Sequence, residues 1–223
     1  MTRFWRRLAL LMWGLFLYAL GIALTIRAQI GYAPWDTFHV GVANTLGITI
    51  GTASISVGIM IMVVTALLRE KVGLGSILNM FAIGLFLDLI LGLVPTATST
   101  LSGVVMLIAG LIVISFASYF YIASGFGAGP RDSLMVALTR QSGLPIGVCR
   151  IVIEGLALIC GWKLGGMVGL GTVLSAFLTG FFVQLTFRLL GFDVTKIQHE
   201  TLAETYLNLK LLALQAKKGR HPS

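Results

Sequence analysis

Two short segments of the chain carry residues whose types and spacing could bind a charged solute. They read GYAPWD and GAGPRD, and each holds a glycine, a proline and an aspartate: Gly31, Pro34 and Asp36 in the first, and Gly127, Pro130 and Asp132 in the second. Glycine permits a bend that turns backbone N–H groups toward a ligand, and proline suits the first position of a helix. Because a helix N-terminus favours negative charge, the bends could hold an anionic group, or the aspartates could cap their own helices.

The second segment differs from the first where the helix begins. Arg131 occupies the place of Trp35, and a guanidinium there would attract a carboxylate or phosphate group. The alternative is a surface arginine that sets the membrane topology. His39 lies one turn beyond Trp35 and could relay protons, or it could simply be solvated. The arginine indicates an anionic solute and the aspartates a cation or a zwitterion, so the solute class stays open.

Two acidic residues lie inside apolar stretches, where a charge is costly. Asp88 has no partner nearby in the sequence, so it could line a wet cavity and couple a proton or cation, or cap a neighbouring backbone group. Glu154 could have a similar coupling role, but it follows Arg150 by four residues, which favours a structural ion pair. Asn79 and Gln184 could form hydrogen bonds between helices.

The chain is duplicated, which explains why these features occur twice. Residues 10–94 return without a gap as residues 106–190, at an offset of 96 set by Pro34 and Pro130. Seven glycines coincide at this offset, where chance would give about one. Among them, Gly84 and Gly180 lie in the middle of matched apolar stretches, where small residues permit close packing of helices.

The composition indicates a membrane protein. Hydrophobic residues make up 57% of the chain, charged residues 11%, and the mean hydropathy is +0.96, which is too apolar for a soluble globule. Six stretches approach the roughly 20 apolar residues that cross a bilayer. They are 8–26, 48–68, 74–94, 104–123, 148–164 and 168–187, of which the fifth is the shortest.

We therefore expect an all-α membrane protein with six transmembrane helices, arranged as two inverted three-helix repeats. Each repeat also has a short half-helix opened by proline, at 34–46 or 130–142, which is too short to span and ends at a glycine. Three crossings per repeat would invert the second copy, a plan used by carriers of small solutes. The predicted parts are an N-terminus (1–9), repeat 1 (10–94), an outer loop (95–105), repeat 2 (106–190) and a tail (191–223) with an amphipathic stretch at 201–216.

The net charge of +8 is explained by topology rather than by nucleic acid. Basic residues gather before the first apolar stretch, after the second, after the fourth and after the sixth. The positive-inside rule then predicts that both termini are cytoplasmic, which agrees with six crossings.

The motifs of common enzymes and metal sites are absent from the sequence. There is no GxxxxGK loop, no GxSxG elbow, no CxxC pair and no His and Glu metal pair at helical spacing. Cys149 and Cys160 lie on one predicted helix, too far apart to pair, and are expected to be packing residues. We expect no enzymatic activity, no cofactor and no metal.

Three segments carry a resemblance to a known family: GYAPWDTFHVG, LGITIGTASI and VGLGSILNMFAIGLFLDL. Here the chain resembles the bacterial inner-membrane proteins of the YczE family, which are related in layout to the YyaS and YitT proteins. The matching positions are Gly31, Pro34, Trp35, Asp36, His39, Gly47, Gly51, Gly75, Asn79, Gly84 and Asp88. The resemblance implies a multi-pass protein of the cytoplasmic membrane. It brings no catalytic or ligand residues, and the tail after Gly191 lies outside it.

The leading hypothesis is a small-solute secondary transporter or permease, working as a homodimer, whose half-helices converge on a central site. Its partners would then be the lipid bilayer, a small solute and a second copy, and no nucleic acid. The alternative is a membrane accessory that docks a partner through its basic tail and the PRD segment, or a substrate-binding subunit driven by a separate ATPase. Whether the half-helices enter the bilayer stays open.

Overall fold

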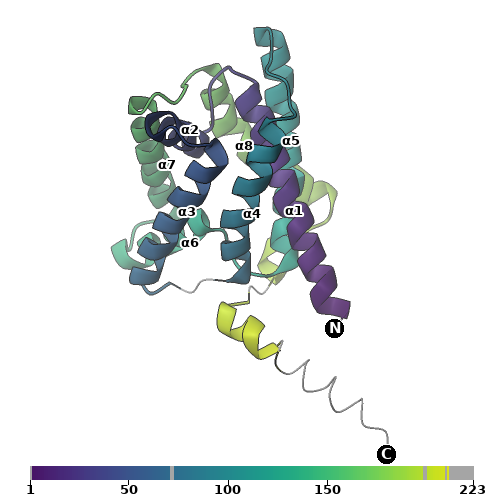
Figure 1. Ribbon diagram of the computed structural model, residues 1–223. Coiled ribbons are helices and arrows are strands. Elements are labelled where there is room, and N and C mark those ends of the chain that lie inside the picture. The colour runs from purple at the N-terminus through teal and green to yellow at the C-terminus, as the bar shows by residue number, and fades with distance from the viewer. Residues whose placement is uncertain (1, 71–72, 198–199, 209, 211–223) are drawn as a thin grey trace, which may run out of the picture.

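The computed structural model describes residues 2–70, 73–197, 200–208 and 210. Within these residues the secondary structure is helical, with long helices side by side in a bundle (Figure 1). The helices are α1 (Thr2–Arg27), α2 (Pro34–Leu46), α3 (Ile50–Leu67), α4 (Leu74–Leu91), α5 (Thr100–Ser124), α6 (Pro130–Ser142), α7 (Ile146–Lys163) and α8 (Leu170–Leu189), followed by the 3-10 turn η1 (Val194–Lys196). The expected all-α membrane protein is confirmed at this level.

Five of the helices are long and apolar enough to cross a membrane: α1, α3, α4, α5 and α8. Their outward side chains are apolar, as lipid contact requires; Leu67, Leu101 and Phe177 are each 76–77% exposed. The sixth expected span corresponds to α7, which has 18 residues but carries Arg150, Glu154 and Lys163. The multi-pass membrane character therefore follows from the structure, while the sixth crossing stays a prediction.

The half-helices begin and end where the sequence predicts. Proline occupies the first position of α2 and of α6, and both helices have 13 residues. Each ends at a glycine in the left-handed conformation, Gly47 at φ 65° and Gly143 at φ 70°, which suits a residue without Cβ. In Figure 1, α2 lies toward the end of the bundle that holds the 92–99 loop, and α6 toward the end that holds the N-terminus.

The two copies of the repeat hold each other through matched hydrogen bonds. The backbone N–H of Gly75 donates to the carbonyl of Phe126 at 2.8 Å, and that of Gly171 donates to the carbonyl of Ile30 at 2.7 Å. Gly171 lies 96 residues after Gly75, and Ile30 lies 96 residues before Phe126. The copy that donates in one bond therefore accepts in the other. Each proline-containing bend is thus fixed to the first turn of the last long helix of the other copy.

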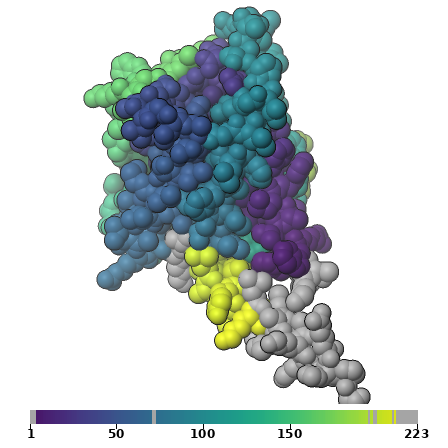
Figure 2. All heavy atoms as spheres, viewed as in Figure 1, coloured from purple at the N-terminus to yellow at the C-terminus, as the bar shows by residue number. Residues whose placement is uncertain are grey.

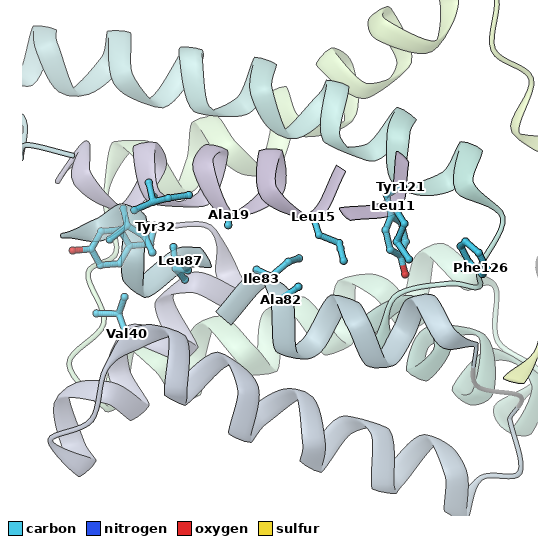
Figure 3. Close-up of a cluster of buried hydrophobic side chains, with 13 residues drawn as sticks. Leu11, Leu15, Ala19, Tyr32, Val40, Ala82, Ile83, Leu87, Tyr121 and Phe126 are labelled. Carbon is cyan, nitrogen blue, oxygen red and sulfur yellow. The ribbon is translucent and has the colours of Figure 1, made fainter. Parts of the chain in front are cut away.

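The main core lies between α1 and α4. Figure 3 shows Leu15 and Ala19 of α1 facing Ala82 and Ile83 of α4, all at most 9% exposed. The core continues to Phe126, which follows α5 and is fully buried. α1 also packs closely along α5, since a Cβ atom on Gly110 would lie 2.7 Å from the carbonyl oxygen of Gly21. Such close backbone approach is the role of small residues between membrane helices.

The copies differ in one packing relation. α3 lies directly against α4, because a Cβ atom on Gly84 would lie 2.7 Å from the carbonyl oxygen of Gly51. At the matched positions of α7 and α8, a Cβ atom on Gly147 or Gly180 would meet no heavy atom of the described chain within 4 Å. A neighbouring backbone approaches Gly84 closely, whereas no described helix approaches Gly180, because α7 stands away from α8; close packing at Gly180 stays a prediction.

The tail begins against the end of the bundle where the N-terminus lies (Figures 1 and 2). The guanidinium of Arg7 pairs with the carboxylate of Glu200 at 2.5 Å, and the N–H of Glu200 donates to the carbonyl of Gly125 at 2.9 Å. Residues 202–208 are helical, in line with the amphipathic prediction for 201–216, and the basic end from 211 onward lies outside the described residues.

The two cysteines are free, as expected. Cys149 is buried, but Cys160 is exposed on α7. The expected packing role therefore fits the first and not the second.

Candidate functional site

The first turns of the two half-helices meet inside the bundle. Arg131 of α6 places its Nη2 atom 3.4 Å from Nε2 of His39 on α2. Its guanidinium carbon lies 4.9 Å from the centre of the Trp35 ring, within the range of a cation–π contact. Residues from opposite copies of the repeat, predicted separately as candidates, therefore form one cluster.

The cluster is internal, which corrects two alternatives raised by the sequence. Asp36 and His39 are only 5% and 3% exposed, so His39 is not a solvated surface residue. Arg131 is half-buried and stacks on Trp35, so it is not a surface arginine. Both outcomes follow from the orientation of α2 and α6, whose first turns present these side chains to each other.

Burial sets the charges of the α2 residues. It raises the pKa of the Asp36 carboxyl to about 6, although the positive charge of Arg131 opposes the shift. Burial also lowers the pKa of His39 well below its usual range, and Arg131 adds to this effect. His39 is therefore neutral at physiological pH and can accept a hydrogen bond from Arg131, while Asp36 changes its charge near that pH.

Three polar groups from different helices surround the start of α6. A Cβ atom on Gly129 would lie 3.6 Å from Oδ2 of Asp132, 3.8 Å from Nδ2 of Asn79 and 3.9 Å from the hydroxyl of Tyr121. Tyr121 is 5% exposed, and its hydroxyl has no hydrogen-bond partner within the described chain. A buried hydroxyl left unpaired costs about 1–3 kcal/mol, which makes this a place where a solute or water would be held.

Sequence reasoning missed the tyrosines of this region. The hydroxyl of Tyr18 on α1 lies 2.6 Å from that of Ser118 on α5, and the rings of Tyr18 and Tyr121 meet edge to face at 6.1 Å. Tyr121 corresponds to Thr25 in the first copy, so the repeat did not mark it. The available signal was Tyr18, which lies in the middle of the apolar stretch 8–26, away from the interfaces where tyrosine is common, whereas Tyr121 lies near the end of α5 and gave no such signal.

Asp88 caps a neighbouring backbone group, the second of the two roles that the sequence left open for it. Its Oδ1 atom accepts the backbone N–H of Gly51 at 2.7 Å, and Oδ2 accepts the hydroxyl of Thr49 at 2.5 Å. The carboxylate thus caps the N-terminus of α3, where the helix dipole favours it. A coupling role for Asp88 stays a hypothesis without support from these contacts.

The remaining candidates lie apart from the cluster or at its edge. Glu154 forms the predicted ion pair with Arg150 at 2.9 Å. Asp132 is exposed at the start of α6, and Gln184 is exposed on α8. Among the residues described, no group of three or more His, Cys, Asp and Glu side chains could hold a metal ion.

Together, the described groups are suited to binding a small charged solute. Arg131 offers a guanidinium, Asp36 an ionisable carboxyl, Tyr121 a hydroxyl and Asn79 an amide. Nothing in this arrangement resembles a nucleophile activated by a base.

The chain is similar to proteins of bacteria. It is 35% identical over 175 residues to the uncharacterized membrane protein YczE of Bacillus subtilis (strain 168), covering 78% of this chain and 81% of that protein. It is 31% identical over 190 residues to an uncharacterized protein of Haemophilus influenzae, covering 85% and 87%, and 28% identical over 176 residues to the uncharacterized protein YyaS of Bacillus subtilis, covering 77% and 88%.

No solved structure matches the chain. A family model described as a family of unknown function (DUF6198) matches residues 5–188. With the likeness to YczE and YyaS, this confirms the family indicated by the three sequence segments, and the chain belongs to the DUF6198 family of YczE-like multi-pass membrane proteins.

Proposed function

We propose that the protein is a secondary transporter or permease for a small charged solute in the bacterial cytoplasmic membrane. The observation that carries the proposal is the contact of Arg131 with His39 and Trp35. It joins the first turns of two proline-opened half-helices that belong to different copies of a repeat. In carriers built from inverted repeats, discontinuous helices of this kind bind the substrate between the copies.

The proposal includes six crossings in two inverted repeats. α7 has 18 residues, as many as α3 and α4, and its Arg150–Glu154 pair lowers the cost of two charges in lipid. The N-terminus and the start of the tail lie at the same end of the bundle (Figure 1), which supports an even number of crossings. The positive-inside rule then places this end in the cytoplasm.

In this proposal the residues of the cluster have separate roles. Arg131 binds the solute, helped by the backbone N–H groups of residues 127–129 and by the Tyr121 hydroxyl. Asp36 couples binding to a proton, because its carboxyl changes charge near physiological pH. One guanidinium and the carboxylates of Asp36 and Asp132 leave the sign of the solute open, and a zwitterion would satisfy both.

Flux through reconstituted protein tests the proposal. Proteoliposomes loaded with a pH-sensitive dye are challenged with separate pools of amino acids, carboxylates, organic phosphates and organic amines. We expect one pool to drive flux that Arg131→Ala abolishes. Arg140→Ala is the matched control, since Arg140 lies at the other end of α6 and pairs with Glu70 at the surface. Equal loss of flux in the Arg131→Ala and Arg140→Ala variants, or flux that survives Arg131→Ala, would contradict the proposed role of Arg131.

The docking alternative makes a different prediction. The docking alternative requires Arg131 to belong to an exposed contact surface, whereas the Arg131 side chain stacks on Trp35. Deleting residues 195–223 should leave the flux of a carrier intact if the protein still inserts. Loss of function in cells with unchanged flux in liposomes would instead favour an accessory role for the tail.

A further inference from the structure

The contact between α3 and α4 is built from five positions. Gly51 and Gly84 bring the backbones together, and Asp88 accepts the N–H of Gly51. Further along, Gly58 faces Met80, because a Cβ atom on Gly58 would lie 3.4 Å from the Met80 Cβ. The contact includes the start of α3 and the end of α4, near the 92–99 loop.

The second copy has the same register but leaves the contact open. The residues at the matched positions, each 96 further along the chain, are Gly147, Gly180, Gln184, Glu154 and Ala176. Gly147 and Gly180 meet no heavy atom of the described chain within 4 Å on the side where a Cβ would point, and Gln184 is exposed. By topology, this contact would close the opposite end of the bundle, near the N-terminus.

The side chains of the second copy are nevertheless suited to closing. Gln184 has an amide oxygen that can accept the N–H of Gly147, as Asp88 accepts that of Gly51. At the pair that matches Gly58 and Met80, the large and the small side chain lie on exchanged helices. In the first copy a glycine on α3 faces the long side chain of Met80, and in the second the long side chain of Glu154 on α7 would face Ala176 on α8. Paired large and small residues conserve volume in both contacts.

We propose that the two contacts are alternatives, so that α7 closes on α8 in a second state in which α3 leaves α4. This inference rests on the proposed function, in which the repeats are inverted and access to the central cluster alternates. The described state is then closed near the 92–99 loop and open near the N-terminus. Asp88 biases the protein toward it, because a hydrogen bond to a carboxylate is stronger than one to the amide of Gln184.

Paired cysteines test the exchange without any solute. In a background of Cys149→Ala and Cys160→Ala, one variant carries Gly58→Cys with Met80→Cys, whose Cβ atoms are 3.4 Å apart, close to the about 3.8 Å of a disulfide. The matched variant carries Glu154→Cys with Ala176→Cys. Since the latter leaves Arg150 without its partner, it is also made with Arg150→Gln. A third variant carries all four cysteines, and remaining thiols are counted by gel shift with a maleimide polymer after oxidation in membranes.

We expect the 154/176 link to form within single chains and to be blocked when the 58/80 link has formed first. Asp88→Asn should speed the 154/176 link about tenfold, because it removes a charge-assisted bond of the described state. Both links in one molecule would overturn the inference. The inference would also be overturned if the 154/176 link formed only between two chains. It would be overturned as well if this link failed to form in well-folded protein with either Asp or Asn at position 88.

The result is separable from the proposed function. Exclusive linking without flux of any solute pool would keep the two states and reject transport. Flux that continues in protein locked by the 58/80 link would keep transport and reject the exchange.

Discussion

The different surroundings of Gly84 and Gly180 predict different effects of the same substitution. A Cβ atom on Gly84 would lie 2.5 Å from Cγ1 of Ile55 and 2.7 Å from the carbonyl oxygen of Gly51. On Gly180 it would meet no heavy atom of the described chain within 4 Å. Both glycines lie inside long helices, so alanine gains about 1 kcal/mol of helix propensity at either site and this gain cancels in the comparison.

The expected difference is the cost of overpacking. Forcing extra atoms into a packed contact costs about 1–3 kcal/mol, which is about a 5- to 150-fold change in the unfolding equilibrium. Gly84→Ala should therefore be less stable than Gly180→Ala by this amount, and Gly180→Ala should match or exceed the parent protein. Unfolding of the purified protein in mixed micelles with increasing denaturing detergent, followed by tryptophan fluorescence, measures both.

Equal destabilisation by the two substitutions would refute the reasoning, because it would mean that Gly180 is as closely packed as Gly84. A larger loss at Gly180 would place the resting protein in the state where α7 closes on α8. Gly180→Leu extends the test, since a lipid-facing position tolerates the larger side chain and a packed one does not.

Three further predictions concern single contacts. Asp36→Asn should raise the stability at pH 7.5 relative to the parent protein and remove the loss of stability that ionisation of Asp36 causes: the raised pKa means that this group makes the parent protein less stable as the pH rises from 3.8 to about 6. Thermal denaturation of both proteins at a series of pH values measures the difference. Asp88→Asn should cost about 1–3 kcal/mol of stability, because the cap of α3 loses its charge, whereas Gln184→Ala should change stability by less than about 0.5 kcal/mol; detergent unfolding compares the two. Glu200→Gln should expose the tail by weakening its ion pair with Arg7, seen as faster trypsin cleavage after residue 196 with no change in the cleavage of the bundle.

The half-helices were predictable because proline and glycine act locally. Pro34 and Pro130 mark the first residues, and Gly47 and Gly143 mark the stops, so the bounds could be placed without knowledge of the packing. The spans were predictable for a similar reason, since their length and hydropathy are properties of single segments. Only α7, with its three charged residues, departs from that pattern.

The orientation of the half-helices was not predictable to the same degree. The burial of His39 depends on how α2 turns about its own axis. Apolar residues recur at helical spacing at Trp35, Phe38 and Val42, but these are only half-buried, and the buried face of α2 instead carries Asp36 and His39. The contact with Arg131 depends on two helices from different copies. A repeat in the sequence also predicts equal packing in both copies, so the gap between α7 and α8 could not be anticipated from Gly147 and Gly180.

The matched bonds from Gly75 to Phe126 and from Gly171 to Ile30 make the two halves interdependent. Neither half contains the acceptor that its own last long helix needs, so neither is a finished piece of protein by itself. During synthesis the first bend remains unsecured until Gly171 has left the ribosome.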